Sequence, residues 1–216
     1  MITMMYLRRV QLFPITVALV VLFVALPQTG YAGGWSVIDR RVHEDDSGVW
    51  NPVVYRGLAG VLGAAYLGGA LWEGSESRLG KTLWRTMDSQ ILALGSATVM
   101  KYAFTRERPS ETNNPDHWFA HGSNHSFPSV ETALSASMVT PFVLEYGGEH
   151  PAAYGLLLLP LHVGVARVKN REHWQSDVLA GWVVGGLSGW FSHRRKTPLV
   201  VQLLPHGGFV GLKTRF

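Results

Sequence analysis

Cysteine is absent from the 216 residues of this chain, and the charged residues do not run together. The lack of cysteine excludes disulfide bridges, thiolate zinc sites and a cysteine nucleophile. The net charge is +4, but its dispersed arrangement differs from the clustered basic stripe that is typical of nucleic-acid-binding proteins. We therefore expect no nucleic-acid partner.

Long apolar runs are also scarce. A membrane-spanning helix needs about 20 predominantly apolar residues. Beyond the N-terminus only the stretch 53–73 approaches this length, and it contains Arg56. Further apolar stretches lie near 87–103, 129–146, 151–168 and 177–193, but they are short or interrupted by charged residues, histidine or glycine. We expect these stretches to be the buried helices of a soluble, exported protein. The alternative is an integral inner-membrane protein of six helices.

The N-terminus has the pattern of an export signal. Arg8 and Arg9 precede the apolar segment 15–26, and small residues follow up to Ala32. Cleavage is expected after Ala32, so residues 1–32 are predicted to be a signal peptide. In the six-helix alternative the same segment is the first transmembrane helix. The signal-peptide interpretation predicts a periplasmic or secreted location.

The remaining chain is predicted to form one helical domain over residues 33–196 and a short tail over residues 197–216. Its length is sufficient for a single domain with a sizeable core. The alanines and glycines of 53–73 are spaced for close helix packing. The tail has the pattern of two short strands around a "PHGG" turn, so we expect a β-hairpin that packs on the helical body.

Three short segments carry the residues that point to chemistry. They are "KYAFTRERP" with Lys101 and Arg108, "SFPSVET" with Ser129, and "ARVKNREHWQSD" with Arg167, His173 and Asp177. Each segment alone is a weak signal. Their order along the chain and their position at the ends of predicted helices make the set specific.

The cations of these segments indicate a phosphate site. Lys101, Arg108 and Arg167 would repel one another unless the site receives a multiply charged anion, and arginine matches phosphate oxygens in bidentate geometry. Ser129 directly precedes an apolar helical run, so its hydroxyl and the free N–H groups there also suit an anion. We expect no metal or other cofactor, because the three cations neutralise the phosphate; vanadate could occupy the same site.

His173 and Asp177 are four residues apart and would share one face of a helix. A carboxylate in this position can keep one imidazole nitrogen protonated and leave the other free to attack. The residues therefore predict an oriented nucleophile beside a phosphate cradle.

The pattern resembles the type 2 phosphatidic acid phosphatase (PAP2) superfamily, which includes class A acid phosphatases and vanadium haloperoxidases. The family motifs are K-x(6)-R-P, P-S-G-H and S-R-x(5)-H-x(3)-D. The first is present in full, Pro128 and Ser129 match the start of the second, and Arg167, His173 and Asp177 match the third in spacing. The resemblance implies an all-α bundle with the active site at one end. It also implies that His173, oriented by Asp177, forms a phosphohistidine, while Lys101, Arg108, Ser129 and Arg167 bind the phosphoryl oxygens.

The second motif departs from the family at two positions, with Val130 for glycine and Glu131 for histidine, and Ala166 replaces the serine of the third. The family histidine protonates the leaving oxygen, so Glu131 is the important change. Three interpretations remain open. Glu131 is itself the general acid, or a loop histidine donates the proton (His125, His121 or His117), or the leaving group needs little help.

The predicted function is therefore a metal-independent phosphatase that acts on a phosphomonoester or pyrophosphate bond. A phosphorylated lipid is the favoured substrate, because apolar helices and loop aromatics can receive a chain, and association with a membrane surface would follow. The alternatives are a small soluble phosphate ester as the substrate, or a degenerate member that binds phosphate or phospholipid without hydrolysis. Haloperoxidase activity is a more distant alternative.

Overall fold

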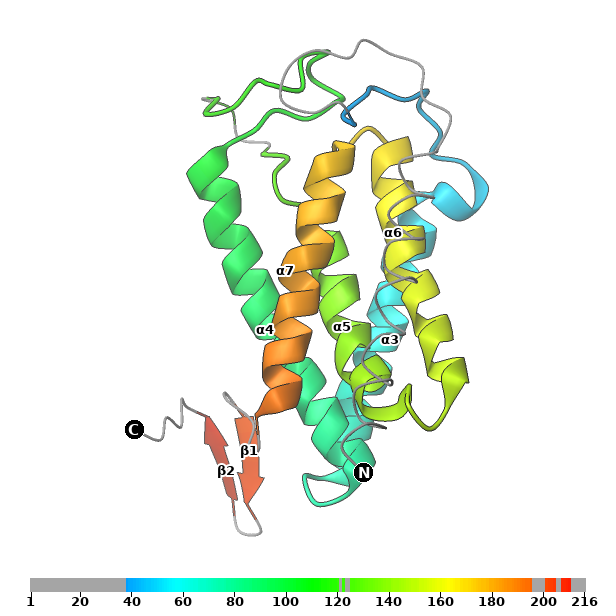
Figure 1. The fold of residues 1–216 in the computed structure, drawn as a ribbon, viewed down its shortest axis with the longest axis vertical. Helices are drawn as coiled ribbons and strands as arrows, with labels where there is room; N and C mark the ends of the chain where they lie inside the picture. The colour runs from blue at the N-terminus through cyan, green and yellow to red at the C-terminus, as the bar shows by residue number, and fades with distance from the viewer. Residues whose placement is uncertain (1–37, 121, 123–124, 196–200, 205–206, 211–216) are drawn as a thin grey trace, which may run out of the picture.

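Helices standing side by side make up the body of the computed structural model, which describes residues 38–120, 122, 125–195, 201–204 and 207–210 (Figure 1). The α-helices within these ranges are α3 (Pro52–Glu73), α4 (Arg78–Phe104), α5 (Val130–Tyr146), α6 (Leu158–Lys169) and α7 (Gln175–Arg194). Two 3₁₀ helices, η1 (Gly48–Trp50) and η2 (Pro151–Leu157), precede α3 and α6. The predicted helical fold is confirmed. The predicted signal peptide lies outside the described residues.

Local capping determines where the first two helices begin. The Asn51 side chain accepts a hydrogen bond from the Val53 N–H, and Pro52 occupies the first helical position, where its missing N–H has no effect. The Ser77 side chain accepts from Gly80 N, so α4 begins at Arg78. The apolar stretch near 87–103 did not indicate this early start, because the Ser77 cap is polar and lies outside the apolar pattern.

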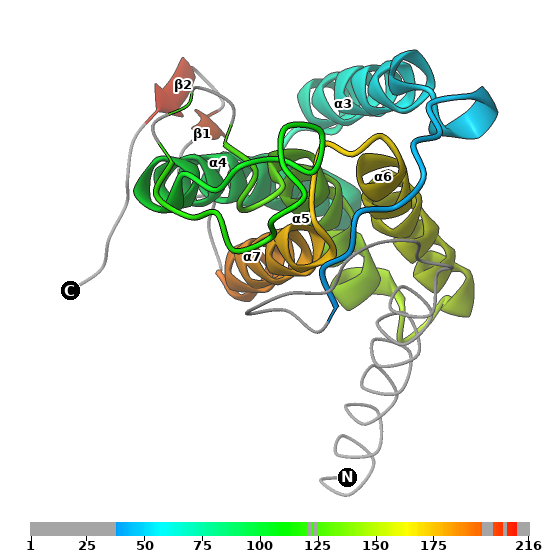
Figure 2. The same cartoon turned by 90° about the horizontal axis from the view of Figure 1, so that it is seen from above.

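Helix α5 lies at the centre of the bundle and contacts α4, α6 and α7 (Figure 2). Its closest neighbour is α7, whose Gly181, Gly185 and Gly189 face it at intervals of four residues. A Cβ added at Gly185 would lie 2.2 Å from the carbonyl oxygen of Ala133. The two helix backbones therefore approach too closely for any side chain at this position.

Helix α3 corrects two expectations from the sequence. A Cβ at Gly57, Gly60, Gly63 or Gly68 would meet nothing within 4 Å, so these glycines do not mediate close packing. The helix is also not a buried core helix, because only Tyr55 and Ala70 are buried. Val53, Val61 and Trp72 are 78%, 69% and 90% exposed. The apolar stretch 53–73 thus presents most of its surface outwards.

Two helices have the length and apolar composition of membrane spans, namely Pro52–Glu73 and the combined segment Pro151–Lys169. Only 11% of the most apolar window of the first is buried, against 39% for the second. The low burial of the first distinguishes it from an ordinary core helix of a soluble protein.

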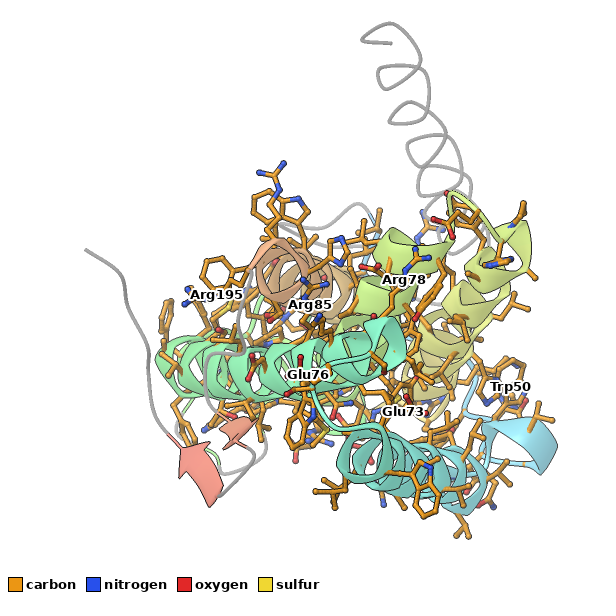
Figure 3. All side chains as sticks on the ribbon, turned by 90° about the horizontal axis from the view of Figure 1, so that it is seen from below. Trp50, Glu73, Glu76, Arg78, Arg85 and Arg195 are labelled. Carbon is orange, nitrogen blue, oxygen red and sulfur yellow. The ribbon has the colours of Figure 1, made fainter. Side chains whose placement is uncertain are left out.

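Charged residues join the helices at the end of the bundle shown in Figure 3. Arg78 of α4 forms ion pairs with Glu145 Oε1 at 2.6 Å and Glu149 Oε2 at 2.7 Å. Arg85 contacts Glu145 at 3.3 Å and donates to the carbonyl of Arg195 at 3.1 Å. Such exposed pairs contribute roughly 0–1 kcal/mol each, so they orient the helix ends more than they stabilise the fold.

The opposite end, uppermost in Figure 1, gathers the segments that the sequence analysis identified. Helices α4 and α6 end there, α5 and α7 begin there, and the loop between α4 and α5 covers them. Segments that are far apart in the chain thus meet at one end of the bundle.

Beyond α7, strands β1 (Val201–Leu204) and β2 (Gly207–Val210) pair antiparallel. Most of the tail over residues 197–216 lies outside the described residues. The complete hairpin, and its packing on the helical body, therefore stay predictions.

Replacing Gly185 with Ala should lower the free energy of unfolding by about 1–3 kcal/mol, because the new methyl group would overlap α5. Gly186→Ala is the matched control, since a Cβ there would meet nothing within 4 Å. The control should gain up to about 1 kcal/mol from the higher helix propensity of alanine. Thermal unfolding of the two variants should therefore shift in opposite directions, and equal shifts would contradict this account of the α5–α7 contact.

Candidate active site

His173 lies in the turn between α6 and α7 and is 1% exposed. Its backbone N–H donates to the carbonyl of Arg167 at 3.3 Å. The ring nitrogens face different partners. Nδ1 is 3.9 Å from Asp177 Oδ2, and Nε2 is 3.7 Å from Glu131 Oε2. Nε2 has no hydrogen-bond partner within the described residues. A nucleophilic role for this nitrogen stays a prediction.

Ser126 lies between His173 and Asp177. Its hydroxyl donates to Asp177 Oδ2 and lies 3.5 Å from His173 Nδ1. The direct distance of 3.9 Å between imidazole and carboxylate is too long for a hydrogen bond. Asp177 therefore acts on the imidazole through its charge and through Ser126, rather than by the direct hydrogen bond that the sequence spacing led us to expect.

Arg106 holds Asp177 from the other side. Its NH1 group lies 2.6 Å from Asp177 Oδ1, and its NH2 group lies 2.6 Å from Asp39 Oδ2. The side chains of all three residues are at most 1% exposed. Burial alone would raise the pKa of Asp177, but His173, the charge of Arg106 and the hydrogen bond from Ser126 together lower it. Asp177 is thereby kept ionised in a buried position.

Asp39 connects this network to the segment that precedes α3. Its Oδ1 accepts a hydrogen bond from Ser176 N at 2.8 Å, and its Oδ2 accepts from Ser176 Oγ at 2.6 Å. Arg40 exchanges two hydrogen bonds with the Gln175 side chain, at 2.9 and 3.0 Å. Residues 38–45 therefore form a strap across the start of α7, and this strap holds the turn that carries His173.

Aromatic rings enclose Arg106. Its guanidinium carbon lies 4.4 Å from the ring centre of Trp118 and 5.4 Å from that of Trp174. Trp118 also packs edge to face against Phe127 at 5.2 Å. Trp118 thus anchors the long loop onto the buried network. These contacts give Trp118 a structural role that needs no contact with a substrate.

The predicted phosphate-binding arginines are joined by a carboxylate that the sequence analysis did not include. Glu172 Oε2 contacts Arg108 NH1 and lies 3.5 Å from Arg167 NH2. Arg167 also donates to the hydroxyl of Tyr55 at 2.5 Å and lies 3.1 Å from Glu131 Oε1. The two glutamates thus pair with the arginines that were predicted to bind phosphate.

Lys101, in the last turn of α4, points to the same site. Its Nζ donates to the carbonyl of His125 at 2.7 Å, and the carbonyl of Ser126 lies 3.4 Å away. Burial and then the charge of Arg108 lower the pKa of Lys101 to about 8. An anion bound beside Lys101 would stabilise its charged form and raise this pKa again.

Glu131 stands in the first turn of α5, between Arg167 and His173. Burial would raise its pKa, but the adjacent His173 and the charge of Arg167 outweigh burial and hold the pKa well below its ordinary value. Glu131 is therefore ionised in the free site. Its role as general acid stays a prediction, and that role requires a proton gained when substrate binds.

The other predicted residues have varied positions. Ser129 is fully buried and caps α5, and its hydroxyl accepts a hydrogen bond from Thr132 N at 3.4 Å.

The loop histidines contact other residues. The ring of His125 packs edge to face against Tyr102 at 6.1 Å, while its carbonyl oxygen accepts a hydrogen bond from Lys101. His117 pairs with Glu107 at 2.7 Å, and His121 lies outside the described residues. The histidine alternatives for the general acid therefore stay predictions.

No group of three or more His, Asp or Glu side chains in the described ranges is arranged to hold a metal ion. The expectation of metal-independent chemistry stays a prediction. The structure brings together Lys101, Arg108, Glu131, Arg167, His173 and Asp177, which interact through the contacts and charges described above.

Five further residues of this site were missed from sequence. They are Asp39, Tyr55, Arg106, Ser126 and Glu172. Arg106, Ser126 and Glu172 lie inside the quoted segments, so their proximity to the motifs was an available signal. Nothing in the local sequence separates Asp39 or Tyr55 from ordinary polar residues.

The helical part of the chain is similar to known proteins. Residues 84–199, more than half of the chain, match the family model of the PAP2 superfamily. The chain is 34% identical over 122 residues to a lipid A 1-phosphatase of Porphyromonas gingivalis. That alignment covers 55% of this chain and 24% of the relative, so the chain spans about a quarter of the relative's length.

Among solved structures, the crystal structure of Aquifex aeolicus LpxE is similar at a TM-score of 0.49 and 21% identity. The match covers 66% of this chain and 85% of that one.

Asp39→Asn should reduce the rate of phosphate release about ten- to a hundredfold, because Arg106 would lose one of its two carboxylates and Asp177 would shift. Leaving this buried charge incompletely paired should also lower the free energy of unfolding by about 3–5 kcal/mol. Asp46→Asn, at an exposed position of the same segment, is the control and should change neither quantity. Activity is measured at a temperature at which circular dichroism shows both variants folded. An unchanged rate in folded Asp39→Asn would refute the positioning role.

The lowered pKa of Lys101 predicts an alkaline limit for phosphate binding. Below pH 8 the ammonium is charged and attracts the anion; above pH 8 it loses its proton, and affinity should fall by up to about tenfold per pH unit. Lys101→Arg should remove this limit, since arginine stays protonated. Calorimetric titration with inorganic phosphate between pH 7 and pH 10, a range chosen to bracket this pKa, measures the effect. A wild-type affinity that is constant over this range would disprove it.

Proposed function

The chain belongs to the PAP2 superfamily, and we propose on that basis that it is a phosphatase that removes phosphate from a phosphorylated lipid. The bond cleaved is a phosphomonoester or pyrophosphate bond. The observation that carries the proposal is the position of His173, with Nδ1 beside Ser126 and Asp177, and Nε2 beside Glu131 in a site that contains three cations.

In the proposed first step, the lone pair of His173 Nε2 attacks phosphorus and the bond between phosphorus and the leaving oxygen breaks. The leaving oxygen takes the bonding electrons and then a proton. Asp177 and Ser126 keep the Nδ1 side of the ring oriented and stabilise the charge that the ring acquires. Lys101, Arg108 and Arg167 bind the phosphoryl oxygens in the transition state. The product is a phosphohistidine and a free hydroxyl group.

In the second step, water attacks the phosphohistidine, the bond between phosphorus and nitrogen breaks, and inorganic phosphate leaves. The ionised Glu131 is suited to accept the proton of this water, because it lies beside the phosphorylated nitrogen. His173 then returns to its starting form, so the chain's own residues complete the cycle.

Glu131 has the opposite task in the first step, and substrate binding supplies the reason. An incoming phosphate competes with Glu131 for Arg167, so the carboxylate loses a cation and gains a dianion as its neighbour. Both changes raise the pKa of the carboxyl group, which favours uptake of a proton. A protonated Glu131 can then donate to the leaving oxygen, as the family histidine does.

The exposed apolar surface supports a lipid substrate. Much of α3 is apolar and faces outwards, and apolar side chains on α4 and α7 are also exposed, including Val99 at 70% and Leu187 at 61%. Large exposed apolar surfaces occur where a protein contacts a membrane or another protein, and the apolar length of α3 favours a membrane. The name of the Porphyromonas gingivalis relative points to the same substrate class. We therefore propose association with a membrane. A periplasmic location depends on the predicted signal peptide and stays an expectation.

Phosphate release by the purified full chain tests the proposal. Wild type should hydrolyse phosphatidic acid, and His173→Ala should lose activity by at least about a thousandfold, because the nucleophile is removed. Equal rates of phosphate release by wild type and His173→Ala would refute the proposed function. Tight phosphate binding without release by the wild type would favour the non-hydrolytic alternative, and hydrolysis of soluble esters alone would favour the acid-phosphatase alternative.

Substitutions of Glu131 separate the interpretations of proton donation in the same assay. If Glu131 is the acid, Glu131→Gln should slow poor leaving groups such as alkyl phosphates more than p-nitrophenyl phosphate, which departs without a proton. Glu131→His should restore alkyl phosphate hydrolysis. An equal loss on both substrates would exclude the acid role and leave Glu131 as a residue that orients His173 and Arg167.

A further inference from the structure

A cavity of about 240 Å³ opens beside the phosphate site, between α3, α4, α5 and α6. Its walls join two residues of the site, Tyr55 and Glu131, to apolar side chains deeper in the bundle. Both residues contact Arg167, so one end of the cavity adjoins the phosphate cradle.

Three helix faces make this wall, and each one starts at the phosphate site. On α5 the face runs from Glu131 through Leu134 to Met138, and on α3 from Tyr55 through Ala59 to Gly63. On α6 the lining residues are Val163 and Leu159, which lie about one and two turns before Arg167. Residues at spacings of three and four share one side of a helix. The lining of this apolar passage therefore extends roughly 10 Å along α5, since seven residues of helix separate Glu131 from Met138 at about 1.5 Å each.

The polar residues of the lining do not disturb its apolar character. The hydroxyl of Ser135 is engaged by its own helix, where it donates to the carbonyl of Thr132 at 3.0 Å. The guanidinium carbon of Arg56 lies 5.8 Å from the Tyr55 ring, so this charge stays at the phosphate end. Gln90 of α4 contributes an amide that can meet a carbonyl or hydroxyl oxygen.

We infer that this cavity binds one acyl chain of the phosphorylated substrate, with the phosphate at Arg167 and the chain directed towards Gly63 and Met138. The inference rests on the proposed function and extends it, because it assigns the part of the substrate beyond the phosphate. The occupant is part of the substrate rather than a separate ligand, since the passage begins at the residues that would bind phosphate. A sugar or nucleotide would leave most of its hydroxyl groups unpaired against this lining.

Gly63 allows a sharp test of chain binding. A Cβ at Gly63 would meet nothing within 4 Å, so a larger side chain can extend into the passage without displacing a neighbour. Gly60 is the matched control. It lies on the same helix, is exposed, has the same open surroundings and is not part of the cavity lining. Glycine-to-leucine changes at both positions alter helix propensity equally.

The experiment compares wild type, Gly63→Leu and Gly60→Leu, each as the full chain in phospholipid nanodiscs. Substrates are p-nitrophenyl, butyl, octyl and dodecyl phosphate, and kcat/KM is measured for each. In wild type kcat/KM should rise with chain length, by about fourfold for each methylene that becomes buried. Gly63→Leu should lower the ratio of dodecyl to p-nitrophenyl phosphate kcat/KM about tenfold or more, through the loss of roughly two buried methylenes. Gly60→Leu should leave this ratio unchanged.

Calorimetric binding of dodecylphosphonate and methylphosphonate to the same three proteins separates this inference from the proposed function. If no protein releases phosphate but wild type prefers the dodecyl ligand and Gly63→Leu loses that preference, the proposed function fails and the chain site stands. If Gly63→Leu and Gly60→Leu behave alike in both assays, another occupant fills the cavity, such as a second part of this chain or a bilayer lipid, and the inference is overturned.

Discussion

The active site depends on one buried guanidinium. Arg106 lies between the carboxylates of Asp39 and Asp177, at 2.6 Å from each, with all three side chains removed from solvent. Charges in such a setting are stable only when they are paired, so each residue requires the other two. This arrangement ties the strap before α3, the end of α4 and the start of α7 to one point. The turn that carries His173 is held in place by the same contacts.

Ion pairs also hold the arginines that are proposed to bind phosphate. Arg108 and Arg167 are paired with Glu172, and Glu131 adds a further contact to Arg167 and His173. These carboxylates stabilise the arginines in the free site. Glu131, which stands where the family motif has a histidine, has two effects, because the same carboxylate pairs with Arg167 and lies beside Nε2 of His173.

Much of the fold could be predicted from the chain alone, since apolar periodicity and caps are local properties. The approximate extents of α3, α5 and α7 agree with the predicted helices, whereas the start of α4 depended on the Ser77 cap. The burial of α3 could not be predicted. An apolar helix has the same composition whether protein or lipid covers it, and only its position at the side of the bundle shows that Val61 and Trp72 face outwards. Similarly, the sequence could not show that the glycines of α7, rather than those of α3, mediate close helix packing. Such packing depends on the distance to the neighbouring helix.

The sequence by itself determined which side chains are present for the proposed chemistry, because one histidine, three cations and the spacing between them can be read from the order of residues. It also determined that His173 and Asp177 are near neighbours in the chain, although His173 lies in the turn before α7 and not on the helix as the spacing had predicted. The tertiary structure alone decided how they interact. It placed Ser126 between them, joined Arg106 to the distant Asp39, and opened an apolar passage from Glu131 along three helices. These relations link residues up to 138 positions apart, from Asp39 to Asp177, and such contacts depend on how helices pack rather than on any local pattern.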